Sequence, residues 1–173
     1  MPLFPPASSG GISNGAAFPV GPATNDLFYR SDRDIIYFYD GTRWLSATEY
    51  SVAIANQRLL PPYVAAFVDL EIVNPGFGEY DIYVTRFQLT ANVSTTTAGN
   101  YYVCQMRTAL GAVQTNIGST LSTQNIALNS WVALNNAPNV VVPSTEALIN
   151  VSATETGTCS AVLLCSFKFR YVG

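Results

Sequence analysis

Turn signals that recur at short intervals are the feature that most restricts the fold of this chain. From residue 63 onward, clusters of Asn, Pro, Gly and Thr interrupt the sequence at intervals of about 8–12 residues, which is typical of β-sandwiches and jelly rolls. We therefore predict an all-β protein with an antiparallel, jelly-roll-like β-sandwich over residues 63–173. The expected strands are Val64–Val73, Tyr80–Leu89, Tyr101–Thr108, Ala112–Ile117, Gln124–Leu128, Trp131–Leu134, Ala147–Ala153 and Cys159–Tyr171.

Two of these strands alternate clearly, and alternation assigns side chains to opposite faces of a sheet. In the predicted strand Tyr80–Leu89, one face is expected to carry Asp81, Tyr83, Thr85, Phe87 and Leu89, and the other face Ile82, Val84, Arg86 and Gln88. In the last strand, the side chains expected to face the core or a partner are Phe167, Phe169 and Tyr171, with Lys168 and Arg170 pointing outward.

A small three-stranded meander is predicted before the sandwich. Its expected parts are a strand Leu27–Arg30, a polar turn Ser31–Asp34, a strand Ile35–Tyr39, a type I′ hairpin turn at Asp40-Gly41 and a strand Arg43–Leu45. The middle strand is apolar at every position, so it needs cover on both faces. The main domain or neighbouring copies of the chain could supply that cover.

The predicted domain organisation has three parts. Residues 1–25 are rich in Pro, Gly, Ser and Ala and read as an extended arm without a core of its own. Residues 26–62 hold the meander and a connector, in which a short helix over Thr48–Asn56 is possible before Pro61-Pro62 ends it. Residues 63–173 form the sandwich.

The composition indicates that part of the surface of this protein is buried against other subunits in an assembly. About 49% of residues are hydrophobic and only 11% are charged, and subunit interfaces are depleted of charge and enriched in aromatic residues. A net charge of −3 without a basic stripe argues against nucleic acid as a partner. We also expect no signal peptide and no membrane contact, because the apolar runs are far shorter than a membrane span.

The residues needed for common catalytic mechanisms are missing. The sequence has no histidine, which removes the usual general base and metal ligand. Same-strand acids such as Asp69 and Glu71 are interpreted as solvated charges, and the arginine within Asp32-Arg33-Asp34 argues against calcium. Three widely spaced cysteines, Cys104, Cys159 and Cys165, are expected to be small buried hydrophobes in a protein folded in a reducing cytoplasm. We therefore predict no enzyme activity, no cofactor and no metal.

Two stretches resemble a module of tailed-bacteriophage virion proteins. They are Gly21–Asp32 and Tyr39–Leu45, the second reading Tyr-Asp-Gly-Thr-Arg-Trp-Leu. The module occurs in tail fibres, head fibres and capsid-decorating proteins, and the aromatic last strand looks like that of their jelly-roll domains. The resemblance implies an assembly interface, which we expect to comprise Phe28, Tyr29, Arg30, Asp32, Tyr37, Tyr39, Asp40, Gly41, Arg43 and Trp44.

The favoured function is a capsid decoration or cement protein that binds and stabilises the head shell of a phage. Its expected partners are further copies of itself in a homotrimer and the major capsid protein or other virion proteins. We expect it on the capsid exterior after synthesis in the host cytoplasm. The alternative is a tail or head fibre that binds host surface glycans, with Tyr101, Tyr102 and Trp131 as candidate sugar contacts. A third possibility, a depolymerase, would need a pair of catalytic carboxylates, and it is disfavoured because same-strand acids such as Asp69 and Glu71 are interpreted as solvated charges.

Overall fold

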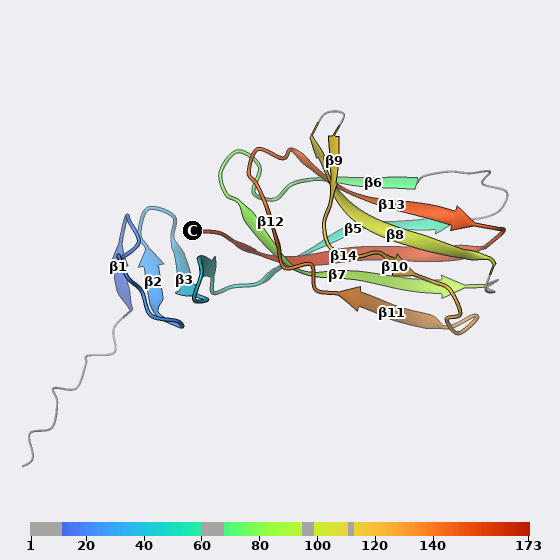
Figure 1. The fold of residues 1–173 in the computed structure, drawn as a ribbon, viewed down its shortest axis with the longest axis horizontal. Coiled ribbons are helices and arrows are strands. Elements are labelled where there is room, and N and C mark those ends of the chain that lie inside the picture. The colour runs from blue at the N-terminus through green and yellow to red at the C-terminus, as the bar shows by residue number, and fades with distance from the viewer. Residues whose placement is uncertain (1–11, 60–67, 95–98, 111–112) are drawn as a thin grey trace, which may run out of the picture. The chain divides into compact units, whose positions relative to one another are not determined.

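The computed structural model describes residues 12–59, 68–94, 99–110 and 113–173. The regular secondary structure in these ranges consists of β-strands alone, which confirms the predicted all-β class. None of the described residues forms a helix long and apolar enough to cross a membrane. The chain divides into a small unit, which runs up to Thr48 and includes Gly173, and a larger unit over Glu49–Val172 (Figure 1).

The larger unit is a sandwich of two antiparallel five-stranded sheets. One sheet has the order β10-β8-β13-β6 with β9 on β8, and the other has the order β11-β7-β14-β5 with β12 on β7. The bounds are β5 Tyr50–Leu59, β6 Val68–Val73, β7 Ile82–Val93, β8 Tyr101–Leu110, β9 Val113–Asn116, β10 Leu121–Ser122, β11 Trp131–Asn136, β12 Val140–Val142, β13 Leu148–Thr156 and β14 Ala161–Tyr171. This architecture confirms the predicted jelly-roll-like sandwich.

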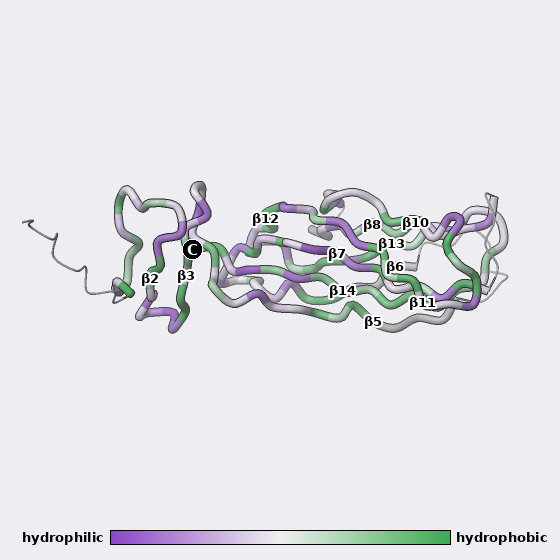
Figure 2. Tube along the Cα trace, turned by 90° about the horizontal axis from the view of Figure 1, so that it is seen from below, coloured by the Kyte–Doolittle hydropathy of each residue, from purple (hydrophilic) through white to green (hydrophobic). Residues whose placement is uncertain are grey.

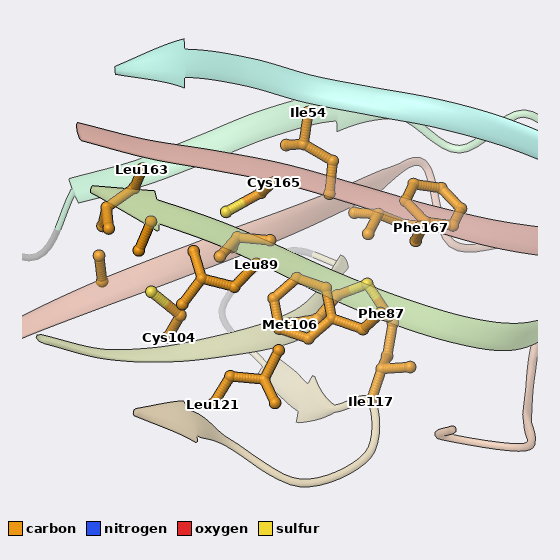
Figure 3. Packing of buried hydrophobic residues seen from close by; sticks show 14 of the residues in the cluster. Ile54, Phe87, Leu89, Cys104, Met106, Ile117, Leu121, Leu163, Cys165 and Phe167 are labelled. Atoms are coloured by element: carbon orange, nitrogen blue, oxygen red, sulfur yellow. The ribbon is translucent and has the colours of Figure 1, made fainter. Parts of the chain in front are cut away.

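The core lies between the two sheets and is almost entirely apolar (Figure 3). β14 alternates as predicted: Phe167 and Phe169 are buried, Tyr171 packs against the core, and the intervening Lys168 and Arg170 are more accessible. Lys168 forms an ion pair with Glu49, with Nζ and Oε2 3.3 Å apart. This pattern lets one strand contribute aromatic rings to the core and cations to the outer face.

The predicted assignment of faces in β7 is wrong in one half of the strand. Ile82 and Val84 are buried, and so are Phe87 and Leu89, although simple alternation would place these two pairs on opposite faces. The register with β14 explains this, because Lys168 pairs with Arg86 and Phe169 pairs with Val84, which leaves Thr85 unmatched. The extra residue is a β-bulge, and a bulge reverses the facing of every side chain beyond it.

The short helix that the sequence allowed over Thr48–Asn56 does not form, because strand β5 begins within this segment, at Tyr50. Ser51 and Ala53 are exposed, whereas Tyr50 and Val52 pack against the core and Ile54 is fully buried. This alternation fits a strand that pairs with β14 from Phe169 to Ala161. The larger unit therefore begins at Glu49 rather than at residue 63.

The remaining strand boundaries differ in detail. Gln124–Leu128 is not a strand, since Asn125 has φ of 60° and only Leu128 forms an isolated bridge, to Val93. The short strands β10 and β12 were not predicted. Residues 64–67 of the first predicted sandwich strand, and residue 112 of the fourth, lie outside the described residues.

We predict that the three cysteine thiols do not react with a thiol reagent in the native protein. All three are buried, and Cys104 and Cys165 enter the space between the sheets (Figure 3). A hydrogen bond with Cys165, together with burial, raises the pKa of the Cys104 thiol. At about pH 8 the reagent should detect almost no thiolate until denaturant is added. Rapid reaction in the native protein would contradict the buried placement.

Candidate functional site

The small unit is a four-stranded sheet in the order β1-β2-β3-β4. The strands are β1 Ser13–Gly15, β2 Leu27–Arg30, β3 Ile35–Tyr39 and β4 Trp44–Ser46. Both strands predicted at the start of the meander have their predicted bounds, and a hydrophilic turn leads into the more hydrophobic β3 (Figure 2). β1 was not predicted, and it pairs in parallel with β2.

Phe18 completes the aromatic core of this unit. Its ring lies 5.0 Å from the ring of Trp44 in a stacked arrangement and 5.1 Å from that of Tyr37, edge to face. The Phe28 ring is 5.7 Å away. Ring pairs at these separations are stabilising beyond the area that they bury. Residues 12–25 therefore supply a strand and a core residue of the small unit, which corrects the expectation of an arm with no core.

Arg30 closes one side of the aromatic cluster. Its guanidinium carbon lies 4.7 Å from the centre of the Phe18 ring, within range of a cation–π interaction. The same group donates two hydrogen bonds to the carboxylate of Asp32, at 2.8 and 2.7 Å. These bonds hold the pKa of Asp32 below its usual range. Both residues were predicted to be in the interface, and the structure gives them a local role in holding the turn after β2.

The turn between β3 and β4 differs from the prediction. Its four residues are Asp40–Arg43, and only Gly41 has positive φ, at 98°, so it is not a type I′ turn at Asp40-Gly41. One oxygen of the Asp40 carboxylate accepts hydrogen bonds from the backbone N–H groups of Thr42 and Arg43, both at 2.7 Å. Aspartate stabilises turns by accepting such bonds. Asp40 and Gly41 thus set the geometry of the hairpin.

The ten predicted interface residues separate into buried and accessible groups. Phe28, Tyr37 and Trp44 are buried, with 4%, 0% and 7% of their surfaces exposed, and Arg30 is also buried. The other six are half-buried or exposed: Tyr29, Asp32, Tyr39, Asp40, Gly41 and Arg43. The aromatic side chains of Phe28, Tyr37 and Trp44 therefore pack in the core of the small unit itself. An interface role for the set stays a prediction.

The exposed apolar residues of the small unit were missed by the sequence reasoning. Ile12, Val20, Leu27 and Ile36 are exposed by 43%, 102%, 45% and 40%. Leu27 and Ile36 share one sheet face, because Leu27 pairs with Phe38, which is two residues from Ile36. The two-sided apolar character of Ile35–Tyr39 could have indicated this face.

A shallow pocket also lies in the small unit. Its volume is about 420 Å³, and its lining comprises Ile12, Ser13, Pro19, Asn25, Asp26, Leu27 and Trp44. The Asp26 carboxylate accepts a hydrogen bond from the Ala23 N–H at 2.8 Å. The pocket therefore combines apolar side chains with an acid and an amide.

The three candidate sugar contacts lie in different environments. Tyr102 is buried, and its hydroxyl donates to the carbonyl of Cys159 at 3.1 Å. Tyr101 is half-buried, whereas Trp131 is 55% exposed on β11. Of the three, only Trp131 therefore presents a largely accessible ring.

Comparisons with known proteins give structural matches alone. No family model matches the sequence, and no curated protein matches it. A structure of the infectious bursal disease virus Gx strain matches with a TM-score of 0.41 and 12% identity, over 76% of this chain and 35% of that one. The VP2 subviral particle of infectious bursal disease virus matches with a TM-score of 0.43 and 10% identity, over 88% of this chain and 41% of that one.

Particles with T=1 symmetry derived from infectious bursal virus give a third match, with a TM-score of 0.40 and 12% identity, over 88% and 40% of the two chains. The chain thus spans less than half the length of these viral chains. Such distant similarity assigns no function to this chain.

We predict that Phe18→Ala destabilises the small unit by about 3 kcal/mol, because it removes the ring that contacts Phe28, Tyr37 and Trp44. The fluorescence of Trp44 during denaturation would measure this loss, with Trp131 replaced by Phe to leave one reporter. Val20→Ala is the matched control, because the Val20 side chain is fully exposed. Equal midpoints for the two variants would contradict a core role for Phe18.

Proposed function

We propose that this chain is a structural protein of a phage particle, a capsid decoration or cement protein that attaches to the head shell through its small unit. The observation that carries the proposal is the exposure of Ile12, Val20, Leu27 and Ile36 on a unit that already has a closed aromatic core. Exposed apolar side chains gathered on one small unit are typical of a protein–protein contact. Their partner in this proposal is the major capsid protein.

The resemblance of the Tyr-Asp-Gly-x-x-Trp module to phage virion proteins supports the same function. In this structure the module builds the hairpin that places Trp44 against Phe18. The module therefore holds a small scaffold together, while the neighbouring side chains of Leu27 and Ile36 remain exposed for contact. A small unit that contains its own core can attach to a shell without having to fold first, which lowers the entropic cost of binding.

A low density of charge also supports a place in an assembly. Only 11% of the residues are charged, and asparagine, serine and threonine supply much of the remaining polarity. Interfaces with few charges avoid the desolvation of unpaired ions. We extend the proposal to a homotrimer on the capsid exterior, which the resemblance to phage decoration proteins favours, and to a role without enzyme activity.

The alternative is a fibre protein that binds host glycans, and the exposure of Trp131 favours it. An accessible indole ring can stack on the apolar face of a sugar. Binding of the purified protein to host cells or to a glycan array, lost in Trp131→Ala, would support this alternative. Binding to shells with no glycan binding would favour the decoration protein.

We predict that the double variant Leu27→Ser, Ile36→Ser lowers occupancy on phage particles by at least about tenfold, because it removes two apolar contacts from the attachment face. Particles that lack the chain would be mixed with each purified variant and separated from unbound protein. The amount bound would then be measured on a gel.

Leu128→Ser, Trp131→Ser is the matched control, because both side chains are similarly exposed but lie in the larger unit. It should bind as the wild type does. Equal occupancy for all three proteins would contradict attachment through the small unit, and failure of the wild type to bind would contradict the proposed function.

A further inference from the structure

The loop between β6 and β7 is braced by a buried asparagine. Asn74 is 2% exposed, and its side-chain amide donates to the carbonyls of Pro143, at 3.2 Å, and Glu146, at 2.9 Å. Its side-chain oxygen accepts a hydrogen bond from the Gly76 N–H at 3.0 Å. One side chain therefore fixes its own loop to the loop between β12 and β13.

Further contacts leave this loop little freedom. The Gly78 N–H donates to the Ser144 carbonyl at 2.9 Å, and the Ser144 N–H donates to the Asp81 carboxylate at 2.7 Å. Gly76 is packed so closely against Tyr80 and Ile82 that a Cβ atom at this position would overlap the Tyr80 carbonyl. Glycine is therefore required here because the backbone passes against its neighbours.

This rigid loop presents apolar side chains to solvent. Phe77 is 52% exposed at the loop, and Val73 is 66% exposed at the end of β6. An aromatic side chain on a fixed loop loses little conformational entropy when a partner binds it. Such side chains are frequent anchors in protein interfaces, where they fill a pocket on the partner.

Acidic residues flank the two apolar side chains in the sequence. Glu71 and Glu79 are exposed, whereas the Asp81 carboxylate accepts a hydrogen bond from the Ser144 N–H and one carboxylate oxygen of Glu146 is buried. The segments 71–81 and 143–147 contain no lysine or arginine. Arg107 is two strands from Glu71, on the far side of Asn150, and its guanidinium already donates to Asn116 and Gln114. The surface around Phe77 therefore combines exposed apolar side chains with the exposed carboxylates of Glu71 and Glu79, which form its negative rim.

We infer that Phe77 and Val73 bind a different protein, one that offers an apolar pocket flanked by lysine or arginine side chains. Opposite charges around an apolar anchor favour the correct partner and accelerate association. The contact uses residues of the larger unit only, and it does not depend on the proposed function.

Neither a symmetric contact through Phe77 nor the small-unit pocket of a second copy satisfies this surface. Two copies that met Phe77 to Phe77 about a two-fold axis would bring the exposed Glu71 and Glu79 of one copy towards the same residues of the other. The pocket in the small unit is lined by Asp26, which has the same sign as the rim around Phe77. Repulsion between like charges therefore selects a chemically different partner.

A displayed library of random peptides tests this inference without requiring knowledge of the partner. Peptides would be selected on the full-length wild-type chain after removal of those that bind Phe77→Ser. The expected peptides carry an aromatic or aliphatic residue flanked by lysine or arginine, and bind the wild type at least about tenfold more tightly than Phe77→Ser. Raising salt from about 50 to about 500 mM should weaken this binding because it screens the charges.

Leu128→Ser is the matched control, since it removes an exposed apolar side chain elsewhere in the larger unit, and it should bind the peptides as the wild type does. Circular dichroism should show that both variants remain folded, because both side chains are exposed. The inference is overturned if no peptide distinguishes wild type from Phe77→Ser, or if the selected peptides lack basic residues. Loss of particle binding in the small-unit variants would not affect this result.

Discussion

The ladder between β7 and β14 is the interaction on which the larger unit depends. The two strands pair from Val93 and Ala161 to Ile82 and Tyr171, and each also pairs with a further strand of the same sheet. The bulge at Thr85 lets both halves of β7 face the core, because it changes the phase of the alternation once. Without it, either Ile82 and Val84 or Phe87 and Leu89 would face solvent.

The small unit depends on a contact of another kind. A four-stranded sheet of short strands is only marginally stable unless one face is covered. Phe18 provides that cover from outside the sheet, by stacking on Trp44 and meeting Tyr37 edge to face. Charged residues gather at the polar turns, and the Arg30–Asp32 ion pair joins the end of β2 to the turn that follows it. Phe28, Tyr37 and Trp44 are thereby buried, and the exposed apolar surface of this unit comes from the aliphatic side chains of Ile12, Val20, Leu27 and Ile36.

Strand pairing in the small unit and hydrogen bonds in the larger unit fix the positions of the candidate contact surfaces. In the small unit, pairing of β2 with β3 aligns Leu27 with Phe38 on the face opposite the aromatic core. In the larger unit, the hydrogen bonds of Asn74 fix the loop that exposes Phe77. In both places, the local structure is held by buried side chains, while neighbouring apolar side chains are exposed to solvent. Exposed apolar side chains of this kind are typical of protein contact surfaces.

The sequence by itself determined the β class, the strands Leu27–Arg30 and Ile35–Tyr39, and the facing of Phe167 and Phe169, because alternation and turn residues act locally. Only the tertiary structure decided the strand at Tyr50–Leu59, the bulge at Thr85 and the packing of Phe18, since each depends on a partner distant in sequence. The same reason separates the candidate interface residues: composition indicated an aromatic cluster, but only packing showed that Trp44 is inside it and Leu27 outside.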